Sequence, residues 1–250
     1  MSKKFKAVII DNQNDKFTRE VKELSTDVLK DGNVLVKIDY SSLNFKDALI
    51  LNNGGRIVRN YPFVPGIDFS GSVEESEDTK FKKNDKVILT GFRVGEMYYG
   101  GFSQYAKVNS DFLVKVPSNL DTLKAMKMGT AGLTALLCAF AVKAKEELLM
   151  GSKVKDVLVT GATGGVGSFA IMALSKMGYD VHAVTGKKEK HEYLKKLGAK
   201  NILDRKQFLG ESKLLEKGLW DCVVDTVGGE GLTKIFAQTK PGGIVALPGN

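Results

Sequence analysis

The first half of the chain has the pattern of short strands separated by turns. Between residue 3 and about residue 120, short runs of β-branched and aromatic residues alternate with Gly, Asn, Asp or Pro. The first group of residues favours strands and the second favours turns. The predicted strands are Phe5–Ile10, Asn33–Ser42, Asp68–Ser76, Asp85–Gly91, Ser103–Asn109 and Phe112–Pro117. Such a series predicts a closed or partly closed β-barrel.

From about residue 121 onward, strands alternate with helices. The apolar run Lys155–Gly161 ends in glycines, and after it Val166, Ala170 and Leu174 recur at helical spacing. The further predicted elements are a lysine-rich helix at Lys187–Gly198 and strands at Asp180–Gly186, Asn201–Asp204, Asp221–Gly229 and Gly242–Gly249. Continuous apolar strands separated by helices are typical of a parallel sheet covered on both faces. The expected fold class is therefore α/β, with a barrel first and a doubly wound parallel sheet after it.

The composition is that of a folded chain in a reducing compartment. The 250 residues are 43% hydrophobic and 26% charged, which excludes a disordered chain. The two cysteines, Cys138 and Cys222, lie far apart with no CxxC motif, so a cysteine-rich zinc site is excluded. The N-terminal segment has no secretory cleavage site, and we expect a cytoplasmic protein.

Neither a membrane nor a nucleic acid is expected as a partner. The longest nearly apolar stretch, Met128–Val142, is shorter than the roughly 20 residues that span a bilayer, so it predicts a buried helix. The formal net charge is +8, from 37 Lys and Arg against 29 Asp and Glu. These lysines are spread along the chain without a nucleic-acid-binding motif, which favours a basic surface or a site for phosphorylated small molecules.

The most informative segment is a glycine-rich turn between a strand and a helix. After Gly161 the chain continues with Ala162-x-Gly164-x-x-Gly167, which is the dinucleotide-binding motif with alanine in its first glycine position. Glycine lets the backbone approach a diphosphate at Gly164 and lets the helix pack closely at Gly167, while the first helical N–H groups face the phosphates. The alternative is a glycine-rich turn that binds no ligand.

The end of the next strand favours NADPH over NADH. NAD sites carry Asp or Glu about 20 residues after the glycines, where it binds the ribose 2′-hydroxyl. This chain has Thr185, Gly186, Lys187 and Lys188 there, and a hydroxyl beside an ammonium suits a 2′-phosphate. Arg205, beyond the third strand, can add a second cation. The alternative is that the two lysines belong only to the solvated face of the following helix.

The whole chain resembles a known enzyme family. The matching strings are SSLNFKDALI (41–50), IVRNYPFVPGIDFSGSV (57–73), LTGFRVGE (89–96), GGFSQYAKV (100–108), KMGTAGLTALLCAFA (127–141), VTGATGGVGS (159–168), HEYLKKLGA (191–199) and DTVGG (225–229). They resemble the zinc-independent quinone-oxidoreductase branch of the medium-chain dehydrogenase/reductases, and within it the NADPH-dependent acryloyl-CoA reductases. The resemblance implies a GroES-like barrel that carries the catalytic and substrate-binding part, residues 1–122, and an NADPH-binding Rossmann domain, residues 123–250.

The same comparison explains why no metal is expected. Zinc-containing members carry Gly-His-Glu where this chain has Gly66, Ile67 and Asp68, and a ligand cysteine where it has the segment 44–47. Catalytic zinc needs three ligands of His, Cys or carboxylate type, and both histidines, His182 and His191, lie in the second half.

The resemblance also implies the site residues. The nicotinamide is expected near Asn44, Phe45 and Thr130, with Asn250 beside it; the diphosphate at Thr163, Gly164, Gly165 and Val166; and the adenosine phosphate at Thr185, Gly186, Lys187 and Arg205. The Asn44 amide is the candidate catalytic group, because it could stabilise negative charge on a thioester oxygen. Close relatives often have Tyr where this chain has Phe45, so Phe45 is assigned to cofactor packing and the proton donor is left open. Alternatively, Asn44 and Asp47 only cap a turn.

The expected reaction is hydride transfer from NADPH to an enoyl thioester such as acryloyl-CoA, or else to a quinone. A Rossmann sheet of this order has six strands and the pattern provides five, so the C-terminal strand and the return segment of the family are expected to be missing. A homodimer is expected for the full-length form, because the sixth strand commonly pairs subunits. A truncated, non-catalytic NADPH-binding protein is the alternative from another functional class.

Overall fold

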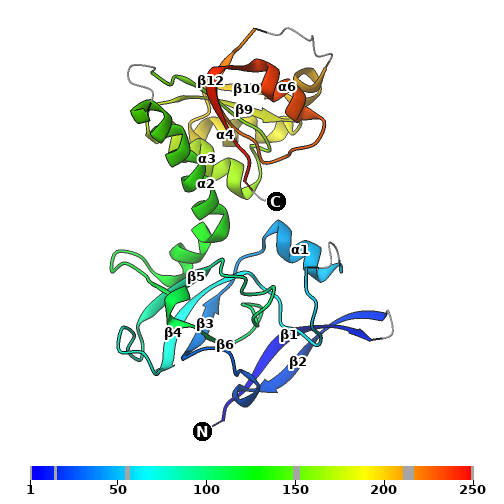
Figure 1. Ribbon diagram of the computed structural model, residues 1–250, viewed down its shortest axis with the longest axis vertical. Helices are drawn as coiled ribbons and strands as arrows, with labels where there is room; N and C mark the ends of the chain where they lie inside the picture. The colour runs from blue at the N-terminus through cyan, green and yellow to red at the C-terminus, as the bar shows by residue number, and fades with distance from the viewer. Residues whose placement is uncertain (1, 14–15, 54–56, 149–152, 211–216, 249–250) are drawn as a thin grey trace. The chain divides into compact units, whose positions relative to one another are not determined.

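The chain divides into two compact units, Met1–Thr130 and Ala131–Asn250 (Figure 1). The computed structural model describes residues 2–13, 16–53, 57–148, 153–210 and 217–248. The helix α2 (Thr122–Leu148) crosses the division, and the change of pattern near residue 122 corresponds to its first residue. Each unit has its own sheet and its own core.

The first unit is built on a five-stranded antiparallel sheet in the order β6-β3-β4-β5-β7. Its strands are β3 (Val34–Tyr40), β4 (Asp68–Ser76), β5 (Lys86–Thr90), β6 (Tyr105–Val108) and β7 (Val114–Lys115). All of them lie within segments that the sequence pattern predicts to be strands. Val34, Val36 and Phe69 are fully buried in one core cluster, while Leu35, on the opposite face of β3, is buried in a second cluster with Phe5 and Ala7 of the N-terminal hairpin.

A separate hairpin extends this unit. It pairs β1 (Lys4–Gln13) with β2 (Lys16–Ser25), and isolated bridges join Ala7 to Ser103 and Ile10 to Phe63. The barrel is therefore partly closed. The sequence pattern missed β2, because its charged residues leave it exposed and, among the described residues, it pairs with β1 alone.

Short helical segments complete the first unit. They are α1 (Phe45–Leu51) and the 3-10 turns η1 (Thr26–Val28) and η2 (Ser110–Phe112). The helix α2 bends at Gly129, whose backbone angles (φ 46°, ψ −153°) are not helical.

By length and hydropathy alone, Thr122–Glu147 of α2 could cross a membrane. Core helices of soluble proteins pass the same test, and Ala135, Ala139 and Val142 of α2 are fully buried in the core of the second unit. The burial predicted for Met128–Val142 is thus found on one face of the helix.

The second unit contains a five-stranded parallel sheet in the order β10-β9-β8-β11-β12, which is the strand order of a Rossmann fold. The strands are β8 (Asp156–Val159), β9 (Asp180–Thr185), β10 (Asn201–Asp204), β11 (Trp220–Val224) and β12 (Thr239–Ala246). The helices that follow them are α3 (Gly165–Lys176), α4 (His191–Leu197), α5 (Arg205–Leu209) and α6 (Gly231–Gln238). The predicted helix Lys187–Gly198 starts later than expected, because residues 188–190 form the 3-10 turn η3 (Lys188–Lys190).

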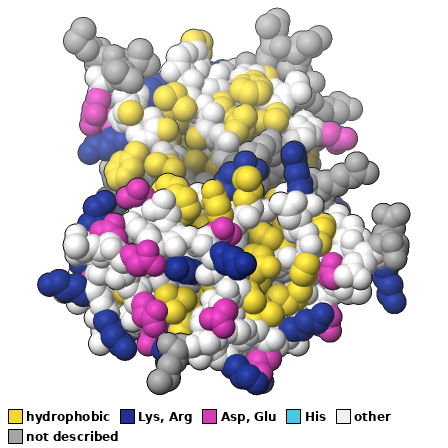
Figure 2. Space-filling model, turned by 60° about the horizontal axis from the view of Figure 1, so that its bottom comes forward, with side chains coloured by type: hydrophobic (Ala, Val, Ile, Leu, Met, Phe, Trp, Pro, Cys, Tyr) yellow, Lys and Arg dark blue, Asp and Glu magenta, His cyan; other side chains and the backbone are white. Residues whose placement is uncertain are grey.

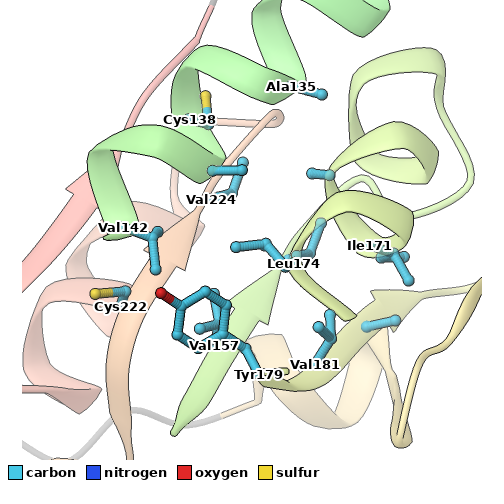
Figure 3. Close-up of a cluster of buried hydrophobic side chains, with 14 of the residues drawn as sticks. Ala135, Cys138, Val142, Val157, Ile171, Leu174, Tyr179, Val181, Cys222 and Val224 are labelled. Atoms are coloured by element: carbon cyan, nitrogen blue, oxygen red, sulfur yellow. The ribbon is translucent and has the colours of Figure 1, made fainter. Parts of the chain in front are cut away.

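Helices cover both faces of the parallel sheet. On β8, Val157 and Val159 pack with α2, α3 and α4, while Leu158 packs with Phe208 of α5 and Ile235 of α6. Figure 3 shows the first of these clusters, which also contains both cysteines. Cys138 and Cys222 are buried free thiols, and burial raises the pKa of each.

Candidate functional site

The glycine-rich turn lies between β8 and α3, as its sequence predicts. Gly161 adopts φ +55°, and Gly164 precedes the first residue of α3. A Cβ at Gly167 would lie 2.4 Å from the Gly161 carbonyl oxygen, so only glycine lets the helix pack this closely to the turn. The first N–H groups of α3 have no acceptor within the helix and are available to an anion.

A cavity of about 430 Å³ opens beside this turn at the carboxyl ends of β8, β9 and β11. Ligands of open parallel sheets bind at this edge, where the strand order reverses. Five predicted or adjacent residues line the cavity, namely Thr163, Thr185, Gly186, Lys187 and Arg205. Phe208, Leu209 and Val227 supply an apolar wall.

The polar corner of the cavity has the composition of a phosphate site. The Lys187 backbone N–H donates to Thr185 Oγ1 (3.1 Å), which fixes the turn after β9. A Cβ at Gly186 would lie 3.3 Å from Arg205 Nε, so the guanidinium lies directly against this glycine. Asp204 caps α5 by accepting from the Lys206 and Gln207 N–H groups, and the hydrogen bond from Gln207 lowers the pKa of Asp204.

Sequence reasoning missed Asp225, which lies at the carboxyl end of β11 and lines the same cavity. Its buried carboxylate accepts hydrogen bonds from the Thr160 hydroxyl and from the N–H groups of Val227 and Gly228 (3.3 and 2.9 Å). The side chain therefore joins the ends of β8 and β11 and shapes the wall of the cavity. The sequence does place Asp225 directly after a buried strand, at the edge of the sheet where ligands bind, and this position could have identified it.

A second group of predicted residues gathers in the first unit around Asn44, which directly precedes α1. The Asn44 N–H donates to Asp47 Oδ2 (2.9 Å), and Asp47 Oδ1 accepts from the Ile67 N–H (2.9 Å). The cap that the sequence offered as the alternative role of Asn44 and Asp47 is thus present. Asp47 is fully buried, and burial raises its pKa.

The Asn44 side chain is engaged inside the protein. Its amide nitrogen lies within hydrogen-bonding distance of Ser42 Oγ, Asp68 Oδ2 and Asp47 Oδ2 (3.0, 3.0 and 3.3 Å). An amide NH₂ group has two hydrogens, and three acceptors compete for them. The arrangement therefore favours a fixed position for Asn44 over donation to a substrate oxygen.

The other predicted nicotinamide contacts differ in exposure. The Phe45 side chain is 81% exposed, so an apolar ring is presented at the start of α1. Thr130 Oγ1 is enclosed and has no hydrogen-bond partner among the described residues. Asn250 lies outside the described residues.

The residues do not fit the zinc site of the metal-containing relatives. Within the described ranges, no three His, Cys, Asp or Glu side chains gather into a possible metal site. Ile67 occupies the position of the zinc-binding histidine in the family motif. Asp47 and Asp68 accept hydrogen bonds from protein donors instead.

The basic charge of the surface is interspersed with acidic side chains. On the face drawn in Figure 2, Lys and Arg alternate with Asp and Glu among the coloured residues. Ion pairs such as Lys46–Glu96 (2.8 Å) and Lys115–Asp85 (2.7 Å) neutralise part of the positive charge. This face differs from the continuous basic stripe typical of nucleic-acid-binding proteins.

Two protein families match the two halves of the chain. Residues 30–118 match the alcohol dehydrogenase GroES-like domain, and residues 165–250 match the zinc-binding dehydrogenase family. The GroES-like and Rossmann folds expected from the sequence are thereby confirmed.

Individual relatives align over almost the whole chain. The acrylyl-CoA reductase AcuI of Ruegeria pomeroyi is 47% identical over 248 residues, which are 98% of this chain and 74% of that protein. The putative quinone oxidoreductase YhfP of Bacillus subtilis is 43% identical over 250 residues, 100% of this chain and 75% of that protein. The crystal structure of the yhdH oxidoreductase from Salmonella enterica in complex with NADP superimposes with a TM-score of 0.89 at 45% identity, covering 97% of this chain and 74% of that one. The chain therefore belongs to the medium-chain dehydrogenase/reductase family, in the group that contains the acrylyl-CoA reductases and their quinone-oxidoreductase-like relatives.

Proposed function

We propose that this protein is an NADPH-dependent oxidoreductase that transfers hydride to the activated double bond of an α,β-unsaturated thioester such as acryloyl-CoA. The observation that carries the proposal is the cavity beside the glycine-rich turn, where Lys187 and Arg205 replace the carboxylate of an NAD site. The 47% identity to the acrylyl-CoA reductase of Ruegeria pomeroyi supports the thioester as substrate.

The residues present fit NADPH. Gly164 and Gly167 have no side chain that would block a diphosphate, and the first turn of α3 offers N–H groups to it. The guanidinium of Arg205 lies against Gly186. When bound, NADPH would supply the hydride, and the protein would supply its position and surroundings.

Each group of residues has a proposed task. Thr163 through Val166 hold the diphosphate against the N-terminus of α3, and Thr185, Gly186, Lys187 and Arg205 hold the adenosine phosphate. In the first unit, the exposed ring of Phe45 packs on the nicotinamide, and Thr130 lies near it. Asn44 caps α1 and so fixes the position of Phe45, the first residue of that helix.

A quinone is the second candidate acceptor. The relative that supports it is the putative quinone oxidoreductase of Bacillus subtilis, at 43% identity over the full chain. A quinone accepts hydride with fewer positional demands than a thioester, so the same nicotinamide site could serve both substrates.

The two thiols bear on where the protein is located. Both cysteines are unpaired and buried, which is typical of cytoplasmic proteins, and we propose that location. The homodimer expected for the full-length form stays a prediction.

The deciding experiment follows NADPH oxidation with acryloyl-CoA, crotonyl-CoA and a small quinone in parallel. We expect kcat/KM to be highest for an enoyl thioester. Rapid turnover of the quinone alone would replace the thioester assignment, and binding of NADPH without turnover of any acceptor would favour a non-catalytic NADPH-binding protein.

A second experiment tests the cofactor. The change Lys187→Glu places a carboxylate beside the 2′-phosphate, and we expect NADPH affinity to fall about 10- to 100-fold while NADH affinity stays within about threefold, because a hydrogen bond to a charged group contributes about 1.5–3 kcal/mol. Lys196→Glu on α4 makes the same charge change outside the cavity and serves as the control. An unchanged preference for NADPH in Lys187→Glu would remove this lysine from the site.

A further inference from the structure

The buried carboxylate of Asp68 lies at the point where three segments of the first unit meet. It belongs to the first residue of β4, and its side chain is fully buried. The hydroxyl of Ser42 donates to it (2.8 and 2.7 Å to the two oxygens), as does the Ser42 N–H (3.1 Å). The Asn44 amide (3.0 Å) and the Thr130 N–H (3.0 Å) complete the set.

These donors come from segments that lie far apart in the sequence and belong to no common helix or strand. Ser42 and Asn44 lie between β3 and α1, whereas Thr130 follows the bend of α2. Among the described residues, no lysine, arginine or histidine forms an ion pair with Asp68. A buried carboxylate is therefore compensated only by neutral donors, and every one of them is directed at its two oxygens.

The space around the carboxylate is restricted. A Cβ at Gly129 would lie 3.0 Å from Asp68 Oδ2 and 3.2 Å from Ser42 Oγ, and this glycine has φ +46°. The bend of α2 thus brings the Thr130 N–H to the carboxylate at a residue where only glycine fits without strain. The geometry of the bend and the position of Asp68 depend on each other.

We infer that Asp68 is a positioning residue, which holds Asn44 and the Thr130 backbone in the arrangement that the nicotinamide requires. This inference rests on the proposed function, because it concerns Thr130, which we place beside the nicotinamide, and Asn44, which directly precedes Phe45 at the start of α1. Asp68 itself touches neither substrate nor cofactor in this proposal. It acts through the hydrogen bonds that fix its neighbours.

The test replaces the carboxylate by an amide of the same shape. In Asp68→Asn, an NH₂ group faces the Ser42 N–H or, with the amide turned over, it faces the Asn44 and Thr130 donors. Either orientation leaves at least one donor opposite another donor. The matched control is Ser70→Ala, two residues further along β4: Ser70 is equally buried and donates to the Thr122 carbonyl (2.8 Å), at the start of α2 and away from its bend.

We expect Asp68→Asn to lower kcat about 100-fold, since small misplacements of reacting groups can have effects of this size. The Kd for NADPH stays within about threefold, because the phosphate contacts lie in the second unit. The deuterium isotope effect on kcat with 4-deuterated NADPH rises, because hydride transfer becomes slower than product release. We expect Ser70→Ala to keep both the kcat and the isotope effect of the parent protein. The melting temperatures of both variants are measured beside kcat, so that a general loss of stability is recognised.

Equal losses of kcat in Asp68→Asn and Ser70→Ala would overturn the inference, as would an unchanged kcat in Asp68→Asn. Should Asp68→Asn not fold, Ser42→Ala carries the test, because it removes the hydroxyl that contacts both carboxylate oxygens. We expect about a fivefold lower kcat at unchanged NADPH affinity in this variant, in line with the loss of one hydrogen bond of about 1 kcal/mol. An unchanged kcat in Ser42→Ala would contradict the inference in that case.

A measurement on the cofactor-free protein separates this inference from the proposed function. Amide hydrogen exchange at Thr130 reports its hydrogen bond to Asp68 directly, and we expect exchange to be about tenfold faster in Asp68→Asn but unchanged in Ser70→Ala. If the parent protein reduces neither thioesters nor quinones, the proposed function fails and this exchange rate alone decides the inference. Unchanged exchange at Thr130 in Asp68→Asn would overturn it.

Discussion

The two glycines of the turn, Gly164 and Gly167, have different physical roles. At Gly167 an added Cβ would lie 2.4 Å from the Gly161 carbonyl oxygen, inside the protein. At Gly164 the nearest atom to such a Cβ is the same oxygen at 3.2 Å, and the residue is exposed. Gly167 is thus required by the fold, whereas Gly164 is required chiefly by a ligand that approaches the backbone.

This difference predicts opposite effects of two alanine substitutions. Gly167→Ala should lower the free energy of unfolding by about 1–3 kcal/mol, as overpacked cores do. Gly164→Ala should change it by less than about 1 kcal/mol but weaken NADPH binding at least about tenfold, because the Cβ blocks the approach of the diphosphate. Urea unfolding and fluorescence titration with NADPH measure the two quantities. Full NADPH affinity in Gly164→Ala would show that the diphosphate does not approach this residue.

Residues near one another in sequence could be assigned from the sequence, whereas those joined by the fold could not. The glycine-rich turn and Lys187 follow directly from local spacing. Asp225 and Asp68 were not predicted as site residues, because each is defined by partners from distant segments, such as Thr160 and Thr130. A buried carboxylate produces no local pattern, since its role depends on the donors that tertiary structure brings to it.

Among the elements, α2 shows how a single residue sets the path of a long helix. Gly129 has φ +46°, and a Cβ there would meet Asp68, Met126 and Ser42 at 3.0–3.2 Å. The bend therefore depends on the absence of a side chain at this position.

We predict that Gly129→Ala destabilises the protein by about 2–4 kcal/mol, combining about 1–2 kcal/mol for a positive-φ backbone conformation that only glycine adopts readily with about 1–2 kcal/mol for the crowded contacts. Gly178→Ala is the control, because Gly178 has φ +93° but no atom lies within 4 Å of its added Cβ. Chemical unfolding of both variants separates the two contributions. A loss of stability no larger in Gly129→Ala than in Gly178→Ala would contradict the steric part of the argument.

Strands that lie in apolar segments were predicted, and the charged strand β2 was not. The five strands of the parallel sheet contain continuous runs of apolar residues, and these runs locate them. In β2 the run Arg19, Glu20, Lys22 and Glu23 gives no apolar face, and the strand exists because β1 pairs with it. The start of α4 was misplaced for a related reason, since the lysine-rich pattern does not distinguish a 3-10 turn from an α-helix.

For the whole molecule, the carboxyl groups determine how stability depends on pH. Hydrogen bonds and nearby lysines lower the pKa of most of the shifted carboxyls. At Asp221, burial alone would raise the pKa, but hydrogen bonds from the backbone and from Lys240 lower it by more. The groups with a lowered pKa are Asp27, Glu74, Asp78, Asp85, Asp121, Asp180, Asp204 and Asp221. Burial raises the pKa of Asp47.

The two kinds of shift have opposite signs in their effect on folding. A carboxyl whose pKa is lower in the folded state stabilises the fold above its unfolded pKa of about 4, and this contribution is lost as the pH falls through the folded value. Asp47 behaves in the opposite way: its contribution is present below its unfolded pKa and is lost as the pH rises through its raised folded pKa. More carboxyls have a lowered pKa than a raised one, so acid should destabilise the protein overall.

We therefore predict that the urea midpoint of the cofactor-free protein is nearly constant from about pH 8 to pH 5 and falls steeply between about pH 4 and pH 3. Asp221→Asn should reduce this dependence, because Asp221 Oδ2 accepts from the Lys155 and Asp156 N–H groups (3.0 and 2.8 Å) and Oδ1 from Lys240 (2.9 Å). In the variant, an NH₂ group replaces one of the two carboxylate oxygens that accept these hydrogen bonds. The variant is therefore less stable at neutral pH, but its urea midpoint falls less on acidification. Parallel urea titrations of both proteins across this range measure the difference, and 1 M salt weakens the lysine contributions because the Debye length is then about 3 Å. A midpoint that rises on acidification would mean that the raised pKa of Asp47 dominates the linkage instead.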